Sequence, residues 1–417
     1  MLDIKLIREK TEQVKADLLK RMPLEKLDLD SIIRLDNRRR ESIDALEKMQ
    51  AERNLASKTK PTPEVIANMK EVGEAIKAQE ENRAAIEKEL TDRLAELPNL
   101  PAPDVVAGGK ENNEVIYTYG KLPKFNFTPK DHVAIATDLG IIDYERAAKM
   151  SGSGFWCYKG AGALLEWALL SYFIDFHTKN GYEFLIPPFL LTEKSAYTSG
   201  HLPKFRDDLF WTQDNLCLNA TSEMMLGNYH RDEILNEEDL PLKYFAYSPC
   251  FRREAGSYRQ EERGMIRGHQ FNKIEMFIFS RPEHSWEMFA ELVQNAKKLV
   301  EGLDLHFQVS KLAAGDCSAA MAKTYDLEIY IPSMGIYKEV SSISNALDYQ
   351  ARRGSIRFKN KENGRNEFVH TLNASGLATS RLIPAILEQN QQEDGSVIVP
   401  KALRPYLPRR MKVIKKD

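Results

Sequence analysis

Cysteine is scarce in this chain, which has four among its 417 residues. Cys157, Cys217, Cys250 and Cys317 lie far apart and form no C-x-x-C pair. The sequence therefore contains neither the ligand spacing of a zinc knuckle nor a disulfide framework. We expect free thiols and no structural zinc.

Long apolar runs are also missing. No stretch approaches the roughly 20 apolar residues that a membrane-spanning helix needs. Residues 1–5 (MLDIK) lack the apolar core of a signal peptide. These absences predict a cytoplasmic protein that does not enter a membrane.

The chain has no large excess of charge of either sign. It carries 59 Lys and Arg residues against 61 Asp and Glu residues, a formal net charge of -2. Nucleic acid could therefore be bound only through a local basic patch. The 42% hydrophobic and 29% charged residues are typical of a folded globular protein, and the length predicts two or three domains.

The usual nucleotide-binding motifs are absent as well. The chain contains no G-x-G-x-x-G and no G-x-x-x-x-G-K-[ST]. His230-Arg231-Asp232 resembles a kinase catalytic loop, but no Asp-Phe-Gly accompanies it, and we attribute the match to chance. If the protein binds a nucleotide, it would use a different motif.

Residues 30–97 differ from the rest because they hold one glycine and no aromatic residue. Apolar residues recur at three- and four-residue intervals, which predicts helix on both sides of a break at Pro61 and Pro63. The two helices would form an antiparallel hairpin, and each helix of about 30 residues would be about 45 Å long. We expect a projecting arm that contacts something large, while a dimerisation coiled coil fits the pattern equally well.

Basic residues crowd this predicted arm. They are Arg34, Arg38, Arg39, Arg40, Arg53, Lys58 and Lys60. Phosphate contacts from such side chains are independent of base sequence and sensitive to salt, which suits recognition of RNA by shape. Interspersed glutamates keep a second interpretation open, in which some of these residues only form ion pairs within a helix.

The region after residue 97 predicts a separate α+β domain. Three prolines within 98–103 and a glycine pair at 108–109 predict a linker. The later pattern favours a mostly antiparallel sheet flanked by helices. Helices are expected at 163–179, 286–303 and 377–389, and strands at 181–188, 244–254, 267–279, 327–331, 336–340 and 367–372.

The most informative segment is a predicted hairpin at 249–275. Arg252 and Glu254 fall on one face of its first strand, because side chains two apart point the same way. The second strand likewise aligns Arg267, His269, Phe271, Lys273 and Glu275. A solvated outer face seldom mixes arginines, an aromatic ring and carboxylates, so we favour a polar cleft.

These motifs resemble those of the bacterial-type seryl-tRNA synthetases, a family of class II aminoacyl-tRNA synthetases. Motif one matches the helix before 181–188, motif two matches 251–254 (FRRE) with its loop, and motif three matches 376–381 (GLATSR). The seryl subclass is favoured by 221–223 (TSE), 267–275 (RGHQFNKIE), 338–345 (KEVSSISN) and 348–353 (DYQARR).

The resemblance implies a fold and an activity. Residues 1–100 would be a tRNA-binding domain with a long antiparallel coiled-coil hairpin at about 30–97, and 101–417 a catalytic domain with a six- or seven-stranded sheet. The enzyme would convert serine and ATP to seryl-adenylate and pyrophosphate, then transfer serine to the 3′ end of serine tRNA, with selenocysteine tRNA as a further acceptor to consider. A homodimer through motif one is implied, and the arm would hold the long variable arm of the tRNA.

The resemblance also implies roles for individual residues. Arg252 and Arg381 would be the catalytic arginines, which neutralise phosphate charge. The implied serine-binding residues are Thr221, Glu223, Arg252, Glu275 and Ser375. The implied ATP-binding residues are Arg252, Glu254, Arg267, Phe271, Glu339, Ser342 and Arg381. Arg38, Arg39, Arg40, Arg53, Lys58 and Lys60 would bind tRNA.

Glu339 and Ser342 would hold Mg²⁺, because they offer hard oxygens three residues apart where a predicted strand ends. A strand-end cap explains the pair without a metal. Glu275 would recognise the serine hydroxyl, and such a site rejects analogues that lack the hydroxyl.

Two features depart from the family pattern, and two other functions are possible for a chain of this kind. Gly268 stands where a larger apolar residue is expected, and the loop 258–262 (YRQEE) is unusual. A related amino acid:carrier-protein ligase would lack the arm. A non-catalytic tRNA-binding paralogue would have lost at least one of Arg252, Glu339 and Arg381, and all three are present.

Overall fold

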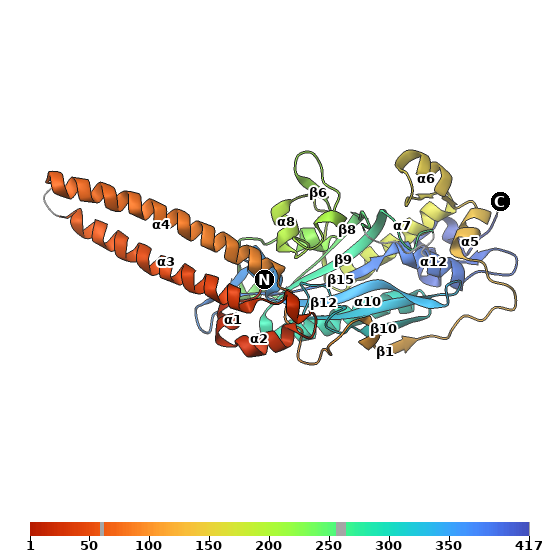
Figure 1. The fold of residues 1–417 in the computed structure, drawn as a ribbon. Coiled ribbons are helices and arrows are strands. Elements are labelled where there is room, and N and C mark those ends of the chain that lie inside the picture. The colour runs from red at the N-terminus through yellow and green to blue at the C-terminus, as the bar shows by residue number, and fades with distance from the viewer. Residues whose placement is uncertain (59–61, 256–263, 417) are drawn as a thin grey trace. The chain divides into compact units, whose positions relative to one another are not determined.

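The computed structural model describes residues 1–58, 62–255 and 264–416 (Figure 1). The chain divides into two compact units, Met1–Leu100 and Pro101–Asp417. Cys157, Cys217, Cys250 and Cys317 are free thiols.

The first unit is helical (Figure 1). It contains α1 (Ile4–Glu9), α2 (Thr11–Leu18), α3 (Leu29–Ala56) and α4 (Pro63–Glu96). Asp28 caps α3 by accepting the Ser31 N–H at 3.0 Å, and Thr62 caps α4 in the same way. The long helices lie antiparallel and bury an apolar stripe formed by Ile32, Leu35, Leu46, Ile76, Ile86, Leu90 and Leu94. The predicted helical hairpin is confirmed.

The second unit is built on an eight-stranded sheet with the order β1-β10-β11-β12-β15-β9-β8-β4. Its strands are β1 (Glu114–Tyr119), β4 (Glu183–Leu185), β8 (Leu242–Phe251), β9 (Gln270–Ser280), β10 (Phe307–Lys311), β11 (Lys323–Ile331), β12 (Ile336–Leu347) and β15 (His370–Ala378). Only the β4–β8 pair is parallel among these neighbours. The mostly antiparallel sheet is confirmed, but β1 extends it beyond the expected six or seven strands.

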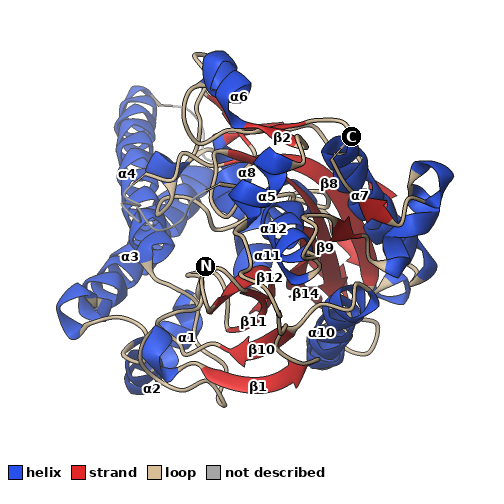
Figure 2. Cartoon of the chain, turned by 90° about the vertical axis from the view of Figure 1, so that its right-hand side faces the viewer, coloured by secondary structure: helices blue, strands red, loops and turns tan. Residues whose placement is uncertain are grey.

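Helices cover one face of this sheet (Figure 2). The principal ones are α7 (Ala161–Lys179), α10 (Ser285–Gly302) and α12 (Thr379–Gln389), close to the predicted ranges. In β9, Ile274, Met276 and Ile278 join these helices in one apolar core. Because side chains alternate along a strand, Lys273 and Glu275 face the opposite side of the sheet.

Shorter elements complete the second unit. The helices are α5 (His132–Asp138), α6 (Tyr144–Ser151), α8 (Glu193–Thr198), α9 (Glu223–Leu226) and α11 (Tyr349–Gly354). The short strands are β2 (Ile142–Asp143), β3 (Cys157–Tyr158), β5 (Leu190–Thr192), β6 (Leu216–Leu218), β7 (Ile234–Asn236), β13 (Arg357–Lys359), β14 (Asn366–Phe368), β16 (Val397–Ile398) and β17 (Val413–Ile414). Every helix among the described residues is too short or too polar to span a bilayer.

The β8–β9 hairpin is shorter than the sequence predicted. β8 ends at Phe251 and β9 begins at Gln270, so Arg252 and Glu254 lie in loop rather than in strand. Glu254 has a φ of 53°, a left-handed conformation that interrupts an extended chain. Arg267 and His269, which the sequence predicts to lie in the second strand, precede β9.

β12 is longer than predicted, so Glu339 and Ser342 lie inside the strand and not at its end. Ser341 pairs with Leu327 and Glu339 pairs with Glu328, which leaves Val340 as an extra residue in a bulge. Residues three apart in a regular strand face opposite sides. The bulge therefore allows Glu339 and Ser342 to face the same side of the sheet.

Candidate active site

A cleft lies on the sheet face opposite the main helices, in line with the alternation in β9. Its main cavity has a volume of about 350 Å³ and is lined by Lys273, Glu275 and residues of the surrounding loops. An adjoining cavity shares Arg252, Glu254 and Arg267 with the main one. The two cavities therefore form one continuous site.

The cleft brings together the residues that the resemblance links to binding of serine, ATP and Mg²⁺. The main cavity is lined by Thr221, Glu223, Arg252, Glu254, Arg267, Glu275, Glu339, Ser342 and Ser375. Phe271 and Arg381 line the adjoining cavity. Their individual roles stay predictions at this point.

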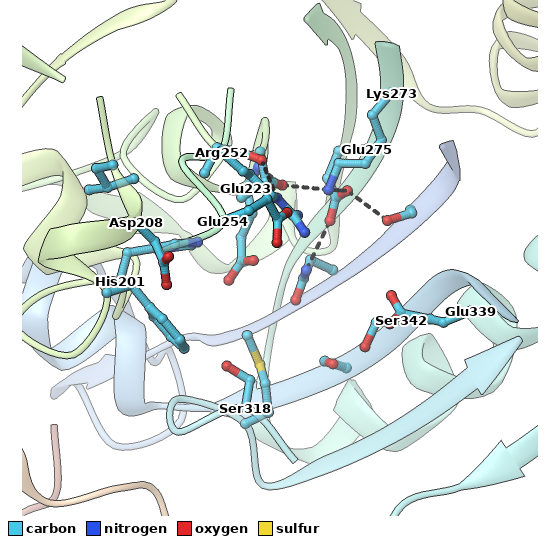
Figure 3. Close-up of a pocket in the computed structure, with 18 of the residues that line it drawn as sticks. His201, Asp208, Glu223, Arg252, Glu254, Lys273, Glu275, Ser318, Glu339 and Ser342 are labelled. Carbon is cyan, nitrogen blue, oxygen red and sulfur yellow. Dashed lines mark hydrogen bonds and ion pairs between the residues drawn. The ribbon is translucent and has the colours of Figure 1, made fainter. Parts of the chain in front are cut away.

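A buried ion pair lines the main cavity (Figure 3). Lys273 is 5% exposed and Glu275 is 1% exposed, and Nζ of Lys273 lies 2.5 Å from Oε2 of Glu275. Lys273 also donates to Oγ1 of Thr221 at 2.6 Å. Glu275 accepts from Nδ2 of Asn373 at 2.9 Å and from Oγ of Ser375 at 3.2 Å. These contacts neutralise and orient a carboxylate that would otherwise be costly to bury.

Glu223 is a second buried carboxyl in the same cavity. Burial raises the pKa of Glu223 to about 7, and the nearby Glu275 adds to the rise, against the opposing effects of Lys273 and a hydrogen bond from Gln350. That bond joins Nε2 of Gln350 to Oε1 of Glu223 at 2.7 Å. A ligand cation beside Glu223 would favour its charged form.

Arg252 lies where the two cavities meet. Its backbone N–H donates to the His269 carbonyl at 2.9 Å, and Nδ1 of His269 donates to the Arg252 carbonyl at 3.0 Å. Its Nε donates to the Ala220 carbonyl at 3.3 Å, and Cζ lies 5.2 Å from the centre of the Phe271 ring. Among the described residues its terminal nitrogens have no partner, so they are available to a carboxylate or phosphate.

The adjoining cavity carries two more arginines. Nε of Arg267 lies 2.6 Å from Oε2 of Glu254. Nη1 of Arg381 lies 3.6 Å from Oε2 of Glu339. One guanidinium group can donate two parallel hydrogen bonds to two phosphate oxygens. This end of the cleft is therefore suited to an anionic ligand.

Packing explains the unexpected glycine at position 268. A Cβ at Gly268 would lie 2.2 Å from a ring atom of Trp156 and 2.8 Å from the Gly154 carbonyl oxygen. The Trp156 ring thus occupies the space that a larger side chain would need. The unusual loop at 258–262 lies outside the described residues.

The basic residues of the predicted arm are not equivalent. Arg34, Arg38, Arg40, Arg53 and Lys58 are exposed on the helical unit.

Arg39 is half-buried, and its Nη2 lies 2.7 Å from Oδ1 of the fully buried Asp36. Asp36 also pairs with Arg8 at 2.6 Å. Arg39 therefore neutralises a buried charge, a role that the sequence reasoning missed. Lys60 lies outside the described residues.

Several residues of the cleft escaped sequence reasoning. Asn373 lies two positions before Ser375 in β15, so strand alternation could have identified it. His201 and Phe205 come from a loop and Asp208 from the short 3-10 helix Arg206–Asp208, and no periodicity predicts where these segments lie. Strand alternation predicts the correct face of β9 for Lys273, but it predicts no role for this residue.

The donor set in the cleft limits the kinds of metal site. Among the described residues, no group of three His, Cys, Asp or Glu side chains is arranged to hold a metal ion. Glu339 and Ser342 nevertheless offer one carboxylate and one hydroxyl to the same cavity. Mg²⁺ is often bound by only one or two protein ligands together with phosphate oxygens and water. The Glu339–Ser342 pair is compatible with such a site.

Comparison with known proteins gives the same picture for the whole chain. Residues 1–101 match the family model of the seryl-tRNA synthetase N-terminal domain, and residues 204–390 match that of the tRNA synthetase class II core domain (G, H, P, S and T). The serine–tRNA ligase 2 of Clostridium acetobutylicum is 52% identical, over 98% of this chain and 99% of the relative. The serine–tRNA ligase of Geobacter sulfurreducens is 44% identical, over 98% of both chains.

Solved structures are similar over the same extent. A crystal structure of seryl-tRNA synthetase from Pyrococcus horikoshii complexed with ATP has a TM-score of 0.93 and 36% identity, covering 100% of both chains. The cytoplasmic serine–tRNA ligase from Naegleria fowleri in complex with AMP has a TM-score of 0.89 and 31% identity, covering 100% of this chain and 99% of that one.

Proposed function

Because this chain belongs to the seryl-tRNA synthetase family, it is a serine–tRNA ligase of class II, and we propose that the cleft described above is where serine is activated. Serine and ATP give seryl-adenylate and pyrophosphate, and serine then passes to the 3′ end of tRNA. The observation that carries the proposal is the buried Lys273–Glu275 pair beside Arg252. Neither a carrier-protein ligase nor a non-catalytic paralogue has support from the relatives.

Serine is bound at the deep end of the cleft in this proposal. Glu223 accepts a hydrogen bond from its ammonium group, Thr221 lines the same part of the cavity, and Arg252 binds its carboxylate. Glu275 and Ser375 contact the hydroxyl, because they form a fixed polar wall of suitable size. Alanine and glycine have no hydroxyl, so they would leave Glu275 and Ser375 without this hydrogen bond. The site would therefore select serine over alanine and glycine.

ATP occupies the shallower end. Arg252 is shared between the serine carboxylate and the α-phosphate, so it neutralises charge on both reactants. Glu254 accepts from the adenine amino group, Phe271 and Arg381 pack on the two faces of the ring, and Arg267 contacts the phosphates. The attacking serine carboxylate is already ionised, so activation needs no general base.

Glu339 and Ser342 are the residues that would hold Mg²⁺. The bulge at Val340 turns both toward the cavity, which supports their pairing in this role. When bound, the ion would neutralise phosphate charge and stabilise the departing pyrophosphate.

The tRNA is bound in part by the helical hairpin of the first unit. Its exposed basic residues would contact phosphates of the long variable arm of serine tRNA. The proposal places the enzyme in the cytoplasm, where tRNA is charged.

A homodimer through motif one is also proposed. It is supported by exposed apolar residues on α7 and the following segment, since Trp167 is 57% and Ile186 is 70% exposed. Exposed apolar surface of this kind is typical of an interface.

Amino-acid-dependent exchange of pyrophosphate into ATP tests the serine site. The parent is expected to exchange with serine and much more weakly with alanine and threonine. Glu275→Ala should lower the preference for serine over alanine by tenfold or more, because the hydroxyl loses its acceptor. Glu287→Ala, at an exposed position of α10, serves as the control. An unchanged preference in Glu275→Ala would contradict the assignment.

A further inference from the structure

The end of the chain carries a concentration of positive charge that has no part in the proposed activation of serine. Residues 396–416 hold seven Lys and Arg residues and no Asp or Glu, although the whole chain has a net charge of -2. Six of the seven are exposed, and we call them the C-terminal basic surface: Lys401, Arg409, Arg410, Lys412, Lys415 and Lys416. Charge of one sign gathered in this way attracts an anionic partner.

The fold holds this surface in place. β16 pairs with β17, and Val397 lies opposite Ile414 in this pair. Ile414, Leu403 and Leu407 are buried and join the main apolar core of the second unit. The basic side chains therefore project from a fixed backbone, which lowers the conformational entropy that they would lose on binding a ligand.

Two arginines of the surface adopt a backbone conformation that arginine does not favour. Arg409 and Arg410 both have a φ of 51°, in the left-handed region that glycine and asparagine occupy at lower cost. The turn alone would therefore be easier to build without arginine. Binding of an anion accounts for positive charge at these two positions, whereas the geometry of the turn does not.

Most of the surface has no acidic partner. Within residues 1–58, 62–255 and 264–416, four members of the surface form no ion pair with a carboxylate, and these are Lys401, Arg409, Arg410 and Lys412. Exposed lysines elsewhere in the second unit do have such partners, as Lys361 does with Glu238 at 2.7 Å. The unpaired side chains keep all their hydrogen-bond donors available to phosphate oxygens.

The surface lies near the cleft through α5. Lys416 is within range of electrostatic attraction to Asp138, the last residue of α5, and Figure 1 shows the C-terminal end beside this helix. The start of α5 packs on Gly264, where a Cβ would lie 2.5 Å from Cγ2 of Val133. Gly264 comes three residues before Arg267, which lines both cavities of the cleft. One short helix therefore separates the surface from the segment that enters the cleft.

α12 gives the scale of this separation. The helix starts at the cleft, where Ser380 and Arg381 line the adjoining cavity. It has 11 residues, so its two ends lie about 16 Å apart. Directly after the helix, Gln391 forms a β-bridge with Val397 of β16. A nucleic acid whose end lies in the cleft can therefore place phosphates on the surface.

We propose that the C-terminal basic surface binds phosphates of the acceptor stem of tRNA, the duplex that carries the 3′ end. The transfer of serine requires the 3′ end to enter the cleft, so this duplex has to lie beside the cleft. Contacts between basic side chains and phosphates fix the position of a duplex without reading its sequence. The proposal rests on the proposed function, because it takes the cleft as the place of transfer. It adds a second RNA contact to that of the helical hairpin.

Two variants with equal loss of charge test the surface. The tail variant removes three cations of the surface by the substitutions Arg409→Gln, Arg410→Gln and Lys412→Gln. The control variant removes three exposed cations of the β13–β14 hairpin by the substitutions Lys359→Gln, Lys361→Gln and Arg365→Gln. A further variant, Lys401→Gln with Lys412→Gln, leaves the turn at 409–410 unchanged and should show a smaller effect in the same direction as the tail variant.

The Kd for serine tRNA is measured over a range of salt concentrations. In the tail variant the Kd at 0.15 M salt should rise about tenfold or more, and the slope of log Kd against log salt concentration should fall by about two, because three phosphate contacts are lost. The control variant should stay within about twofold of the parent, with an unchanged slope. The tail variant should show the same loss with an RNA hairpin that contains only the acceptor stem and the 3′ end.

Three results would overturn the proposal. The first is equal weakening in the tail and control variants, or an unchanged Kd and slope in the tail variant. The second is weaker binding of whole tRNA together with unchanged binding of the acceptor-stem hairpin. The third is unchanged tRNA binding together with loss of binding to phosphatidylserine vesicles, which would assign the surface to anionic lipid. A parent enzyme without serine-dependent pyrophosphate exchange would instead contradict the proposed function, which the Kd measurements do not test.

Discussion

Individual residues of the cleft are buried, charged and paired, which makes their chemistry dependent on pH. Lys273 and Glu275 neutralise each other, whereas the second carboxyl in the cavity, that of Glu223, has the neutral amide of Gln350 as its one hydrogen-bond partner within residues 1–58, 62–255 and 264–416. Its ionisation is therefore the one most open to control by the ligand.

The pH dependence of serine binding follows from Glu223. Its pKa is raised to about 7, so in the free enzyme it is increasingly protonated below that pH and loses its attraction for an ammonium group. The KM for serine in pyrophosphate exchange should rise as the pH is lowered from about 8 to about 6. Glu223→Gln should have a high KM that varies little over this range. The same steep pH profile in Glu223→Gln would refute this role.

At the scale of elements, α7, β9 and α12 meet at one buried carboxyl. Oε1 of Glu166 accepts from Nδ2 of Asn272 at 2.8 Å and from Oγ1 of Thr379 at 2.7 Å. These partners are next to Phe271 and close to Arg381, so the contact helps to fix both elements that form the proposed adenine site.

Glu166 should make the stability of the protein fall as the pH rises. Burial raises its pKa from 4.5 to about 7, so the folded chain holds a proton that the unfolded chain releases between these values. The stabilisation is complete below about pH 4.5 and is lost as the pH rises through 7. Gln at position 166 carries no charge at any pH, so the variant Glu166→Gln lacks this loss of stability. The free energy of unfolding of Glu166→Gln minus that of the parent should therefore rise by a few kcal/mol when the pH is raised from 5 to 8. Urea unfolding of both proteins at the two pH values measures this difference. An equal change in the free energy of unfolding of the parent and of Glu166→Gln would contradict the prediction.

The elements also show what could be predicted from the sequence. Alternation placed Lys273 and Glu275 on one face of β9, and the three- and four-residue spacing gave both long helices, because these patterns repeat over many residues. The bulge at Val340 and the left-handed turn at Glu254 interrupt a pattern at one residue and leave no periodic signal. The pairing of Arg39 with Asp36 was missed because charge patterns do not reveal which carboxyl is buried.

Loop residues of the cleft escaped prediction for a different reason. His201 and Ser318 line the same cavity because the two loops that carry them pack together at Gly200 and Ala320. Such contacts depend on the tertiary fold, and the sequence near either loop holds no sign of them. The roles inferred from the resemblance to a family, in contrast, concern residues within contiguous motifs.

At the scale of the whole molecule, we propose that the first compact unit binds tRNA and that the second catalyses the reaction. Nε2 of Gln79 donates to Oγ of Ser42 at 3.1 Å, which marks a point where α3 and α4 lie side by side. Replacing residues 44–77 with a short glycine linker should therefore shorten the hairpin without disturbing its base.

The shortened enzyme should keep serine-dependent pyrophosphate exchange within about twofold and lose most of its transfer of serine to tRNA. The removed segment includes Arg53, Lys58 and Lys60, and loss of phosphate contacts should also make tRNA binding less dependent on salt. Rates of exchange and of tRNA charging, measured on the same preparation, check this. Equal charging by the shortened and parent enzymes would show that the distal hairpin has no role in RNA binding.

The central claim is that the cleft on the catalytic sheet activates serine through Arg252. Its neighbour Arg253 provides a matched control, since it is exposed and donates from Nη1 to the Asp207 carbonyl at 3.2 Å. Serine-dependent pyrophosphate exchange should fall about a hundredfold or more in Arg252→Ala, with little change in Tm, and stay within about threefold of the parent in Arg253→Ala. Exchange by Arg252→Ala within threefold of the parent would contradict the account.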